Sequence, residues 1–306
     1  MSAKHVPLPE TLPPPFSFSG MLAELFGESP SDEEAEDFAP PALTPLRRPV
    51  EESTLGLFVS CGVYHRSQEP LGTVNDLSYR LIDRDMPYDE LILGHGALVR
   101  KFAVGDLNVA YPRERLVELE REGVFRALAP QAVSMVGAIG SYTDLMRRTV
   151  PAIAAEFERQ GVDLVLLLPF CPKCHTTVSL IARGLETRGL PTVMTSCNWE
   201  VSQAIKAPRT AFLDFPMGCP AGKPGEPALQ REVLRTTLRA APDFAGPWRP
   251  LELPFSWSPD GSRAWEKEIR DLYANDAGFA ARRAAVESTV EKLAGQEDEF
   301  VIRCDC

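Results

Sequence analysis

Residues 169–177 read PFCPKCHTT, so two cysteines stand three positions apart with a histidine directly after them. The segment follows the apolar run DLVLLLP and precedes a stretch with helical periodicity, which places it where a strand passes into a helix. A thiol at a helix N-terminus lies near unpaired backbone N–H groups and the positive end of the helix dipole, and both favour the thiolate. We therefore predict that Cys171 is the nucleophile and Cys174 the resolving thiol.

Three interpretations of this pair stay open from the sequence. Thiol chemistry, redox or nucleophilic, is favoured over a metal or iron–sulfur site and over two buried structural cysteines. A metal site built on Cys171 and Cys174 needs two further ligands, and the chain has no second CxxC motif. The candidates for those ligands are Cys61, Cys197, His175, Cys304 and Cys306.

Other residues with suitable chemistry follow predicted strands or loops. His95 lies between two glycines, which allow close backbone approach, and it joins His175 as a candidate general acid. The candidate substrate-binding residues are Cys61, His65, Cys197 and Asp214. Because ligands bind at the carboxyl ends of strands in open α/β sheets, we expect these residues to border one crevice.

The chain ends in VIRCDC. Two cysteines at a chain terminus could carry electrons to the active site, so Cys304 and Cys306 form a candidate redox shuttle. An incidental tail and a pair of metal ligands are the alternatives.

Apolar strands alternate with predicted helices of about 10 to 20 residues, a pattern typical of βαβ units. Strands are predicted at 55–62, 106–112, 132–140, 163–169, 190–197 and 210–216. Helices are predicted at 112–123, 141–161, 173–189, 225–241 and over most of 262–294. The expected fold class is α/β, with a doubly wound, mainly parallel sheet and helices on both faces, as one domain or as two similar lobes that meet near residues 140–160.

Composition divides the chain into three parts. Residues 1–52 are rich in proline and acidic side chains and are expected to be extended or disordered. Residues 53–245 form the α/β core, and 246–306 form a mostly helical extension. The net charge of −11 argues against unaided binding to nucleic acid or to an anionic membrane. Without a signal sequence or an apolar span, the seven cysteines indicate a cytoplasmic protein with reduced thiols, and a homo-oligomer is expected.

Five segments between about residues 55 and 240 carry a family resemblance, and they read SCGVYH, GDLNVAYPRERLVELEREGVF, APQAVSMVGAI, GVDLVLLLPFCPKCHTTVSLIARGLETRGLPTV and APRTAFLDFPMGCPAGKPGEPALQREVLRTTL. The chain resembles the selenoprotein B family of glycine, sarcosine, betaine and D-proline reductases. The resemblance implies reductive cleavage of a carbon–heteroatom bond, C–N or C–S, with Cys171 and Cys174 at the positions that match the family's selenocysteine motif. This sequence departs from the family in having cysteine where the namesake enzymes have selenocysteine, so a selenium-free reductase or lyase is expected. The resemblance further implies a dithiol or thioredoxin-like electron donor and a partner subunit that carries a pyruvoyl group.

Overall fold

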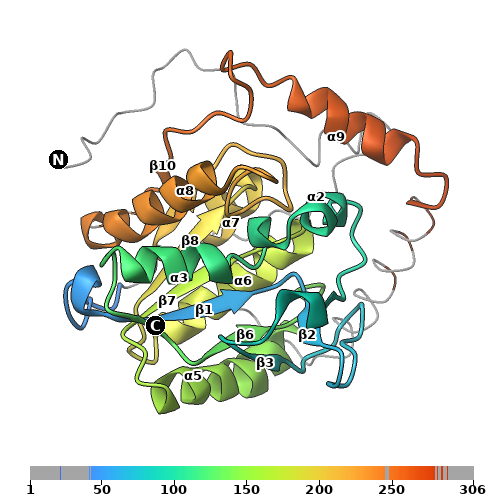
Figure 1. Cartoon of the computed structure of the whole chain (residues 1–306). Coiled ribbons are helices and arrows are strands. Elements are labelled where there is room, and N and C mark those ends of the chain that lie inside the picture. Colours follow the sequence, from blue (N-terminus) through green and yellow to red (C-terminus); the bar gives the residue numbers. More distant parts are fainter. Residues whose placement is uncertain are drawn as a thin grey trace.

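The computed structural model describes residues 43–244 and 248–279, together with Met21, Pro41, Ala281, Ala284 and Ser288 (Figure 1). Cys304, Cys306 and most of the predicted tail 1–52 lie outside the described residues. The domain boundaries at residues 52 and 245 stay predictions. Within the described ranges, the model contains no helix long and apolar enough to cross a membrane.

One sheet forms the centre of the described chain, in the order β10-β9-β8-β7-β1-β6-β3, and β5 pairs with β1. Neighbouring strands are parallel except β3, which runs antiparallel to β6. The strands are β1 (Thr54–Val59), β3 (Arg80–Asp83), β5 (Ala127–Leu128), β6 (Gln131–Ser134), β7 (Leu164–Leu168), β8 (Thr192–Ser196), β9 (Thr210–Phe212) and β10 (Leu251–Glu252). The expected mainly parallel α/β fold is confirmed. Since β1 lies between β6 and β7, the strands before and after residue 150 belong to one sheet, and the alternative of two lobes does not apply.

Helices cover both faces of this sheet. The α-helices are α2 (Arg100–Gly105), α3 (Arg113–Arg121), α4 (Tyr142–Asp144), α5 (Val150–Arg159), α6 (Pro172–Glu186), α7 (Trp199–Ile205), α8 (Pro227–Ala240) and α9 (Trp265–Ala274). A π-helical segment, η4 (Leu145–Thr149), joins α4 to α5. Short 3-10 turns are η1 (Val50–Glu52), η2 (Tyr88–Glu90), η3 (Leu107–Val109) and η5 (Ala241–Asp243). A separate antiparallel ribbon pairs β2 (Val63–His65) with β4 (Leu91–Leu93).

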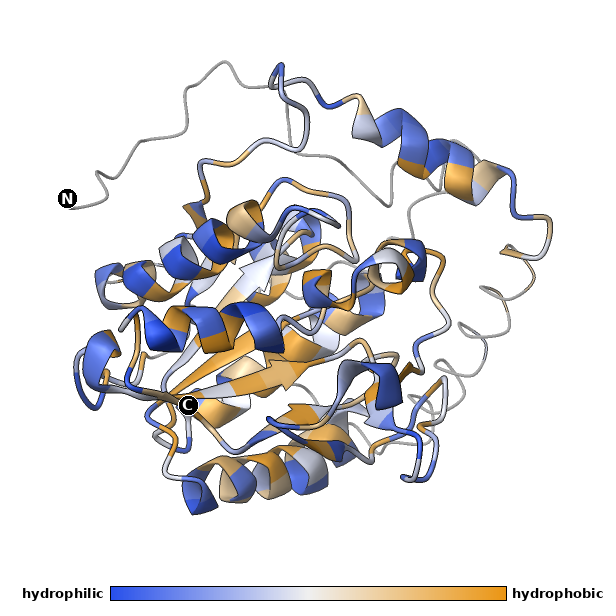
Figure 2. Ribbon diagram, viewed as in Figure 1, coloured by the Kyte–Doolittle hydropathy of each residue, from blue (hydrophilic) through white to orange (hydrophobic). Residues whose placement is uncertain are grey.

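The central strands are buried on both faces, so their side chains alternate between two apolar clusters. Leu164, Leu166 and Leu168 of β7 pack with leucines of α3 and α8 on one face. Val165 and Leu167 pack with α5 and α6 on the other face. The continuous apolar run of β7 follows from this double burial, and Figure 2 shows hydrophobic residues along the central strands.

The predicted strand at 106–112 is wrong. Asp106 accepts a hydrogen bond from the backbone N–H of Asn108 and begins the 3-10 turn η3. Val109 and Tyr111 are buried beside the sheet, which explains an apolar pattern that resembles a strand. A capping aspartate competes with strand pairing, and this competition decides the local structure.

Candidate active site

Cys171 is the N-cap residue of α6, the helix that follows the central strand β7. Its backbone is extended, and its sulfur accepts a hydrogen bond from the backbone N–H of Cys174 at 3.3 Å. Pro172 occupies the first helical position, where a missing N–H costs nothing. The strand-to-helix junction predicted for CPKC is present, and it places both cysteines at the carboxyl edge of the sheet.

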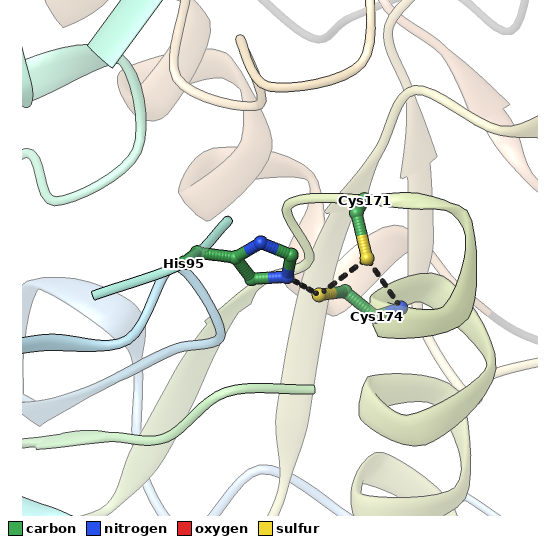
Figure 3. A group of neighbouring side chains, drawn as sticks. All are labelled: His95, Cys171 and Cys174. Carbon is green, nitrogen blue, oxygen red and sulfur yellow. Dashed lines mark hydrogen bonds between the residues drawn. The ribbon is translucent and has the colours of Figure 1, made fainter. Parts of the chain in front are cut away.

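Three side chains meet at this junction (Figure 3). The Sγ atoms of Cys171 and Cys174 lie 3.0 Å apart, and the Nε2 atom of His95 lies 3.2 Å from the sulfur of Cys174. His95 comes from the loop after β4, 79 residues earlier in the chain. All three residues are buried. The two sulfurs are not joined in a disulfide, and a small movement would bring them to bonding distance.

The hydrogen bonds of His95 define its tautomer. The backbone N–H of Ala97 donates to Nδ1 at 3.0 Å, so Nδ1 is an acceptor. A neutral His95 ring therefore carries its proton on Nε2, which points at Cys174. The ring donates a hydrogen bond to that sulfur, and a donor in this position stabilises a thiolate.

The two thiols of the pair differ in acidity. Burial alone would raise the pKa of the Cys174 thiol, but the hydrogen bond from Cys171 and the nearby His95 ring outweigh it and hold this pKa well below its ordinary value. The pKa of the Cys171 thiol is raised well above its ordinary value. Burial is the largest cause, followed by the hydrogen bond to Cys174 and by the negative charge that Cys174 can carry. Of the two thiols, Cys174 is therefore the more acidic, and the Cys171 S–H is directed at its sulfur. The sequence assigned the thiolate to Cys171 from the helix N-terminus alone.

Close backbone contacts hold Cys174 in place. A Cβ atom on Gly137 would lie 2.9 Å from the Cα and Sγ atoms of Cys174, so only glycine fits there without displacement. Thr177 donates a hydrogen bond from its hydroxyl to the Gly137 carbonyl at 2.8 Å, which ties α6 to the loop after β6. On another side, the Cys174 thiol, when protonated, donates a hydrogen bond to the carbonyl oxygen of Ser60 at 3.5 Å.

His175 faces away from the thiols. Its Nδ1–H donates to the carbonyl of Cys171 at 2.7 Å, and its Nε2 accepts from the backbone N–H of Cys197 at 3.2 Å. Burial lowers the pKa of His175 to about 4, so the ring is neutral. With both nitrogens bound to backbone groups, His175 is placed to position the CPKC segment against the end of β8.

The other predicted site residues lie outside the group formed by His95, Cys171 and Cys174. Cys61 is directed at the carbonyl of Ala110 at 3.8 Å, and burial raises its pKa to about 12. Burial also raises the pKa of Cys197. His65 pairs with Glu90 through Nε2 at 2.8 Å. Asp214 pairs with Arg263 at 2.8 Å, and Cys304 and Cys306 are outside the described residues.

Among the described residues, one group of three potential metal ligands lies within 4.8 Å, and it consists of His95, Cys171 and Cys174. The thiols suit a soft metal such as zinc. The histidine does not, because a metal-binding imidazole uses one nitrogen as ligand and donates a hydrogen bond from the other. In this chain the nitrogen remote from the thiols is an acceptor. The donor set therefore fits a dithiol better than a metal centre.

Sequence reasoning missed the two supports on either side of Cys174. Gly137 interrupts an apolar run, and an isolated glycine in such a run is a signal of close backbone approach. Ser60 acts through its backbone carbonyl, which no residue pattern reveals.

The chain matches no protein-family model and no solved structure. It is 27% identical over 218 residues to the D-proline reductase subunit gamma of Acetoanaerobium sticklandii, covering 71% of this chain and 90% of that protein. It is 28% identical over 159 residues to the sarcosine reductase complex component B subunit beta of Peptoclostridium acidaminophilum, covering 51% of this chain and 36% of the relative.

A third relative is the glycine reductase complex component B subunit gamma of Carboxydothermus hydrogenoformans, at 25% identity over 232 residues. That alignment covers 72% of this chain and 53% of the relative. The chain therefore spans about half of the length, or less, of each of the two component B subunits. The names of all three describe subunits of reductases, two of them components of a complex. The family resemblance is confirmed: the curated homologues of this chain are subunits of D-proline, sarcosine and glycine reductases, at modest identity over much of its length.

Proposed function

We propose that the protein is a selenium-free, thiol-dependent reductase that cleaves a C–N or C–S bond of a small substrate with Cys171 and Cys174. The observation that carries the proposal is the contact of the two sulfurs at 3.0 Å, with a histidine N–H directed at one of them. Of the five cysteines in the described residues, Cys174 alone has a lowered pKa. A single stabilised thiolate beside a protonated thiol is the arrangement that dithiol chemistry needs.

The proposed reaction proceeds through the less populated state of the pair, in which Cys171 has passed its proton to Cys174 across their 3.0 Å contact and is the more reactive, less acidic thiolate. The Cys171 sulfur, the less buried of the two, attacks the substrate carbon. A C–S bond forms, the bond from carbon to nitrogen or sulfur breaks, and the leaving group takes the proton held by Cys174. Cys174, again a thiolate, then attacks the Cys171 sulfur.

This second attack forms the disulfide and breaks the C–S bond, and the carbon takes a proton from solvent. The substrate gains two electrons, which the dithiol loses. An external dithiol or a thioredoxin-like protein reduces the disulfide and returns the pair to its starting state. His95 supports the cycle by donating a hydrogen bond to Cys174 whenever that sulfur is charged.

The relatives are named as reductases of D-proline, sarcosine and glycine, which are amino-acid-sized molecules. All three are subunits, and two are named as components of a complex. We extend this to small amines and thioethers as the substrate class of this chain, and to a partner subunit that carries a pyruvoyl group for amine substrates. The free thiols of the described chain are in keeping with a cytoplasmic location.

The test is a thiol count and a metal determination on anaerobically purified protein, before and after mild oxidation and treatment with a dithiol. We expect metal-free protein that loses two thiols on oxidation, yields a peptide linked through Cys171 and Cys174, and regains both thiols with dithiol. A stoichiometric metal that is lost in Cys171→Ser would overturn the dithiol mechanism.

A matched pair of histidine variants tests the electrostatic part of the proposal. In His95→Gln, the pH midpoint for alkylation of the CPKC peptide should move upward, because the thiolate loses its ring donor. His65→Gln is the control, since His65 pairs with Glu90 in a separate ribbon. If the alkylation midpoint of His95→Gln equals that of His65→Gln, His95 does not stabilise the thiolate.

A further inference from the structure

His95 reaches the dithiol from outside the central sheet. It lies in the loop after β4, which belongs to the β2–β4 ribbon, and its Nε2 atom lies 3.2 Å from the sulfur of Cys174 (Figure 3). Glycine stands on each side of it, and glycine gives the backbone more conformational freedom than any other residue. A ring on such a loop directs its N–H at one sulfur only if other groups hold it in place.

The backbone of this loop is held against the segment that follows β1. The N–H of Gly94 donates a hydrogen bond to the carbonyl oxygen of Gly62 at 3.0 Å. A Cβ atom on Gly94 would lie 2.8 Å from that oxygen, so only glycine permits this close approach. The contact fixes where the loop lies, but it does not restrict rotation of the His95 side chain.

The aromatic ring of Phe170 packs against the imidazole of His95. The ring centroids lie 5.1 Å apart and the planes meet at 61°, an edge-to-face arrangement that aromatic rings favour. Phe170 is fully buried and directly precedes Cys171. Together with the Ala97 N–H that bonds to Nδ1, this contact restricts the imidazole to the orientation in which Nε2 faces Cys174.

Phe170 is in turn held by a departure from the regular β1–β7 ladder. Val59 is paired with Leu168, and the N–H of Ser60 continues the parallel pattern by donating to the Leu168 carbonyl at 3.2 Å. In a regular parallel ladder, the N–H of Phe170 would donate to the carbonyl of Ser60. It donates instead to the Ser60 hydroxyl oxygen at 3.0 Å. The side chain of Ser60 therefore replaces its own carbonyl, which accepts from the Cys174 thiol.

Four contacts thus form a closed circuit around the thiol of Cys174. They run from the Ser60 hydroxyl to the Phe170 backbone, from the Phe170 ring to His95, from His95 to the Cys174 sulfur, and from that sulfur to the Ser60 carbonyl. The residues come from the segments after β1, β4 and β7 and from α6. Because each member touches two others, none can shift alone without the loss of two contacts.

We propose that Phe170 is a positioning residue for the dithiol, because its ring holds the His95 imidazole in the orientation that directs Nε2–H at Cys174. The Ser60 hydroxyl supports this role by fixing the backbone from which the ring projects. The importance of Phe170 for turnover rests on the proposed function. Its effect on the acidity of Cys174 does not, and that effect can be measured without any substrate.

The experiment is an anaerobic pH titration of the intact reduced protein, followed by the ultraviolet absorbance of the thiolate. The first deprotonation of the Cys171–Cys174 pair reports the thiolate on Cys174, and its absence from Cys174→Ser identifies it. Phe170→Leu removes the ring and keeps the backbone N–H, so the midpoint should rise by about one pH unit, toward the value of His95→Gln. Phe170→Met, whose flexible side chain refills the space, should shift the midpoint in the same direction.

A double variant separates positioning from a general loosening of the site. If Phe170 acts through His95, Phe170→Leu should add no further shift in the His95→Gln background. A loosened site would instead raise the midpoint by the same amount in both backgrounds. The control is Phe157→Leu, which truncates another fully buried phenylalanine, in the cluster on the opposite face of the sheet, and should leave the midpoint at the wild-type value.

An unchanged midpoint in both Phe170→Leu and Phe170→Met, or a shift that persists undiminished in the His95→Gln background, would overturn the positioning role. In either case the proposed function stands if the pair still forms its disulfide and turns over substrate. If the midpoint shifts through His95 but no disulfide forms on oxidation, Phe170 keeps its role and the reductase proposal falls.

Discussion

The two ends of helix α6 each hold a buried acidic side chain, Cys174 and Glu186, and the surroundings of these two groups differ. At the N-terminal end, the Cys174 thiolate has the helix dipole in its favour and receives hydrogen bonds from Cys171 and His95. Its surroundings leave room for chemistry, because both donors are side chains that can release or exchange a proton.

At the C-terminal end, Glu186 has the dipole against it and is compensated by fixed partners. Arg209 forms a buried ion pair with its carboxylate. Thr192 donates to the same oxygen through its backbone N–H at 2.7 Å and its hydroxyl at 2.9 Å. The backbone N–H of Thr44 donates to the other oxygen at 2.6 Å, so the N-terminal segment is fastened here.

The difference shows how one helix separates stability from reactivity. Burial raises the pKa of Glu186, and the fixed donors Arg209, Thr192 and Thr44 oppose that shift, so this carboxyl group serves to hold elements together. The thiolate with two mobile donors keeps a shared proton, and this makes it reactive. Four predictions follow this contrast, from the largest expected effect to the smallest.

Replacing either Cys171 or Cys174, at the N-terminal end of α6, should abolish turnover. In Cys171→Ser and Cys174→Ser the disulfide cannot form, so the second step of the reaction is lost, while stability should change by only about 1 kcal/mol because serine keeps a hydrogen-bonding group. Product formation with excess dithiol is the measurement. Cys219→Ala, a buried cysteine after β9 that lies outside the pair, should retain activity, and full activity in Cys174→Ser would refute the dithiol mechanism.

Removing Arg209, the cation at the C-terminal end of α6, should lower the free energy of unfolding and leave the reactivity of the Cys171–Cys174 pair unchanged. Arg209→Met leaves the Glu186 charge buried without its partner, so the free energy of unfolding should fall by about 3–5 kcal/mol. Urea denaturation gives this value, and oxidation of the CPKC pair in the folded variant should be unchanged. Arg159→Met, which breaks an exposed pair on α5, is the control and should stay within about 1 kcal/mol of wild type. A similar result for both would mean that the two ends do not differ as described.

Lowering the pH should destabilise the fold through His175, which lies next to Cys174 in the sequence. Its pKa is about 4 in the fold and 6.5 ordinarily, so the unfolded chain binds the extra proton as the pH falls below 6.5. The free energy of unfolding should therefore decrease by up to about 1.4 kcal/mol per pH unit from 6.5 downward and level off near pH 4. Urea titrations over this range measure the slope. His175→Gln, whose amide can bridge the same backbone groups, should lose this component; an unchanged slope would assign the acid sensitivity elsewhere.

The smallest effect is expected from crowding Cys174. Gly137→Ala places a methyl group 2.9 Å from the sulfur, which should cost about 1–3 kcal/mol and slow disulfide formation. Gly105→Ala is the matched control, because a Cβ there meets no atom within 4 Å. Thermal unfolding and the rate of oxidation by a disulfide reagent test the pair of variants. Equal oxidation rates would show that the close approach of Gly137 is not needed.

Local pattern was sufficient for most of the fold. Continuous apolar runs predicted the buried parallel strands, and stretches with helical periodicity predicted α3, α6 and α8. The same reasoning failed at 106–112, where the apolar residues are buried outside the sheet. Period alone does not separate a strand from an irregular segment that packs with alternate residues inward.

The sequence by itself determined the α/β class, the place of CPKC at a strand-to-helix junction and the presence of His95 in a glycine-flanked loop, because periodicity, capping and backbone freedom act over a few residues. Only the tertiary structure decided which groups meet. The sheet order and the β2–β4 ribbon bring His95 to Cys174, and the packing of α6 beside β8 turns His175 toward backbone groups. Such contacts depend on long-range packing, in which residues far apart in sequence share one small volume, and no local pattern encodes that choice.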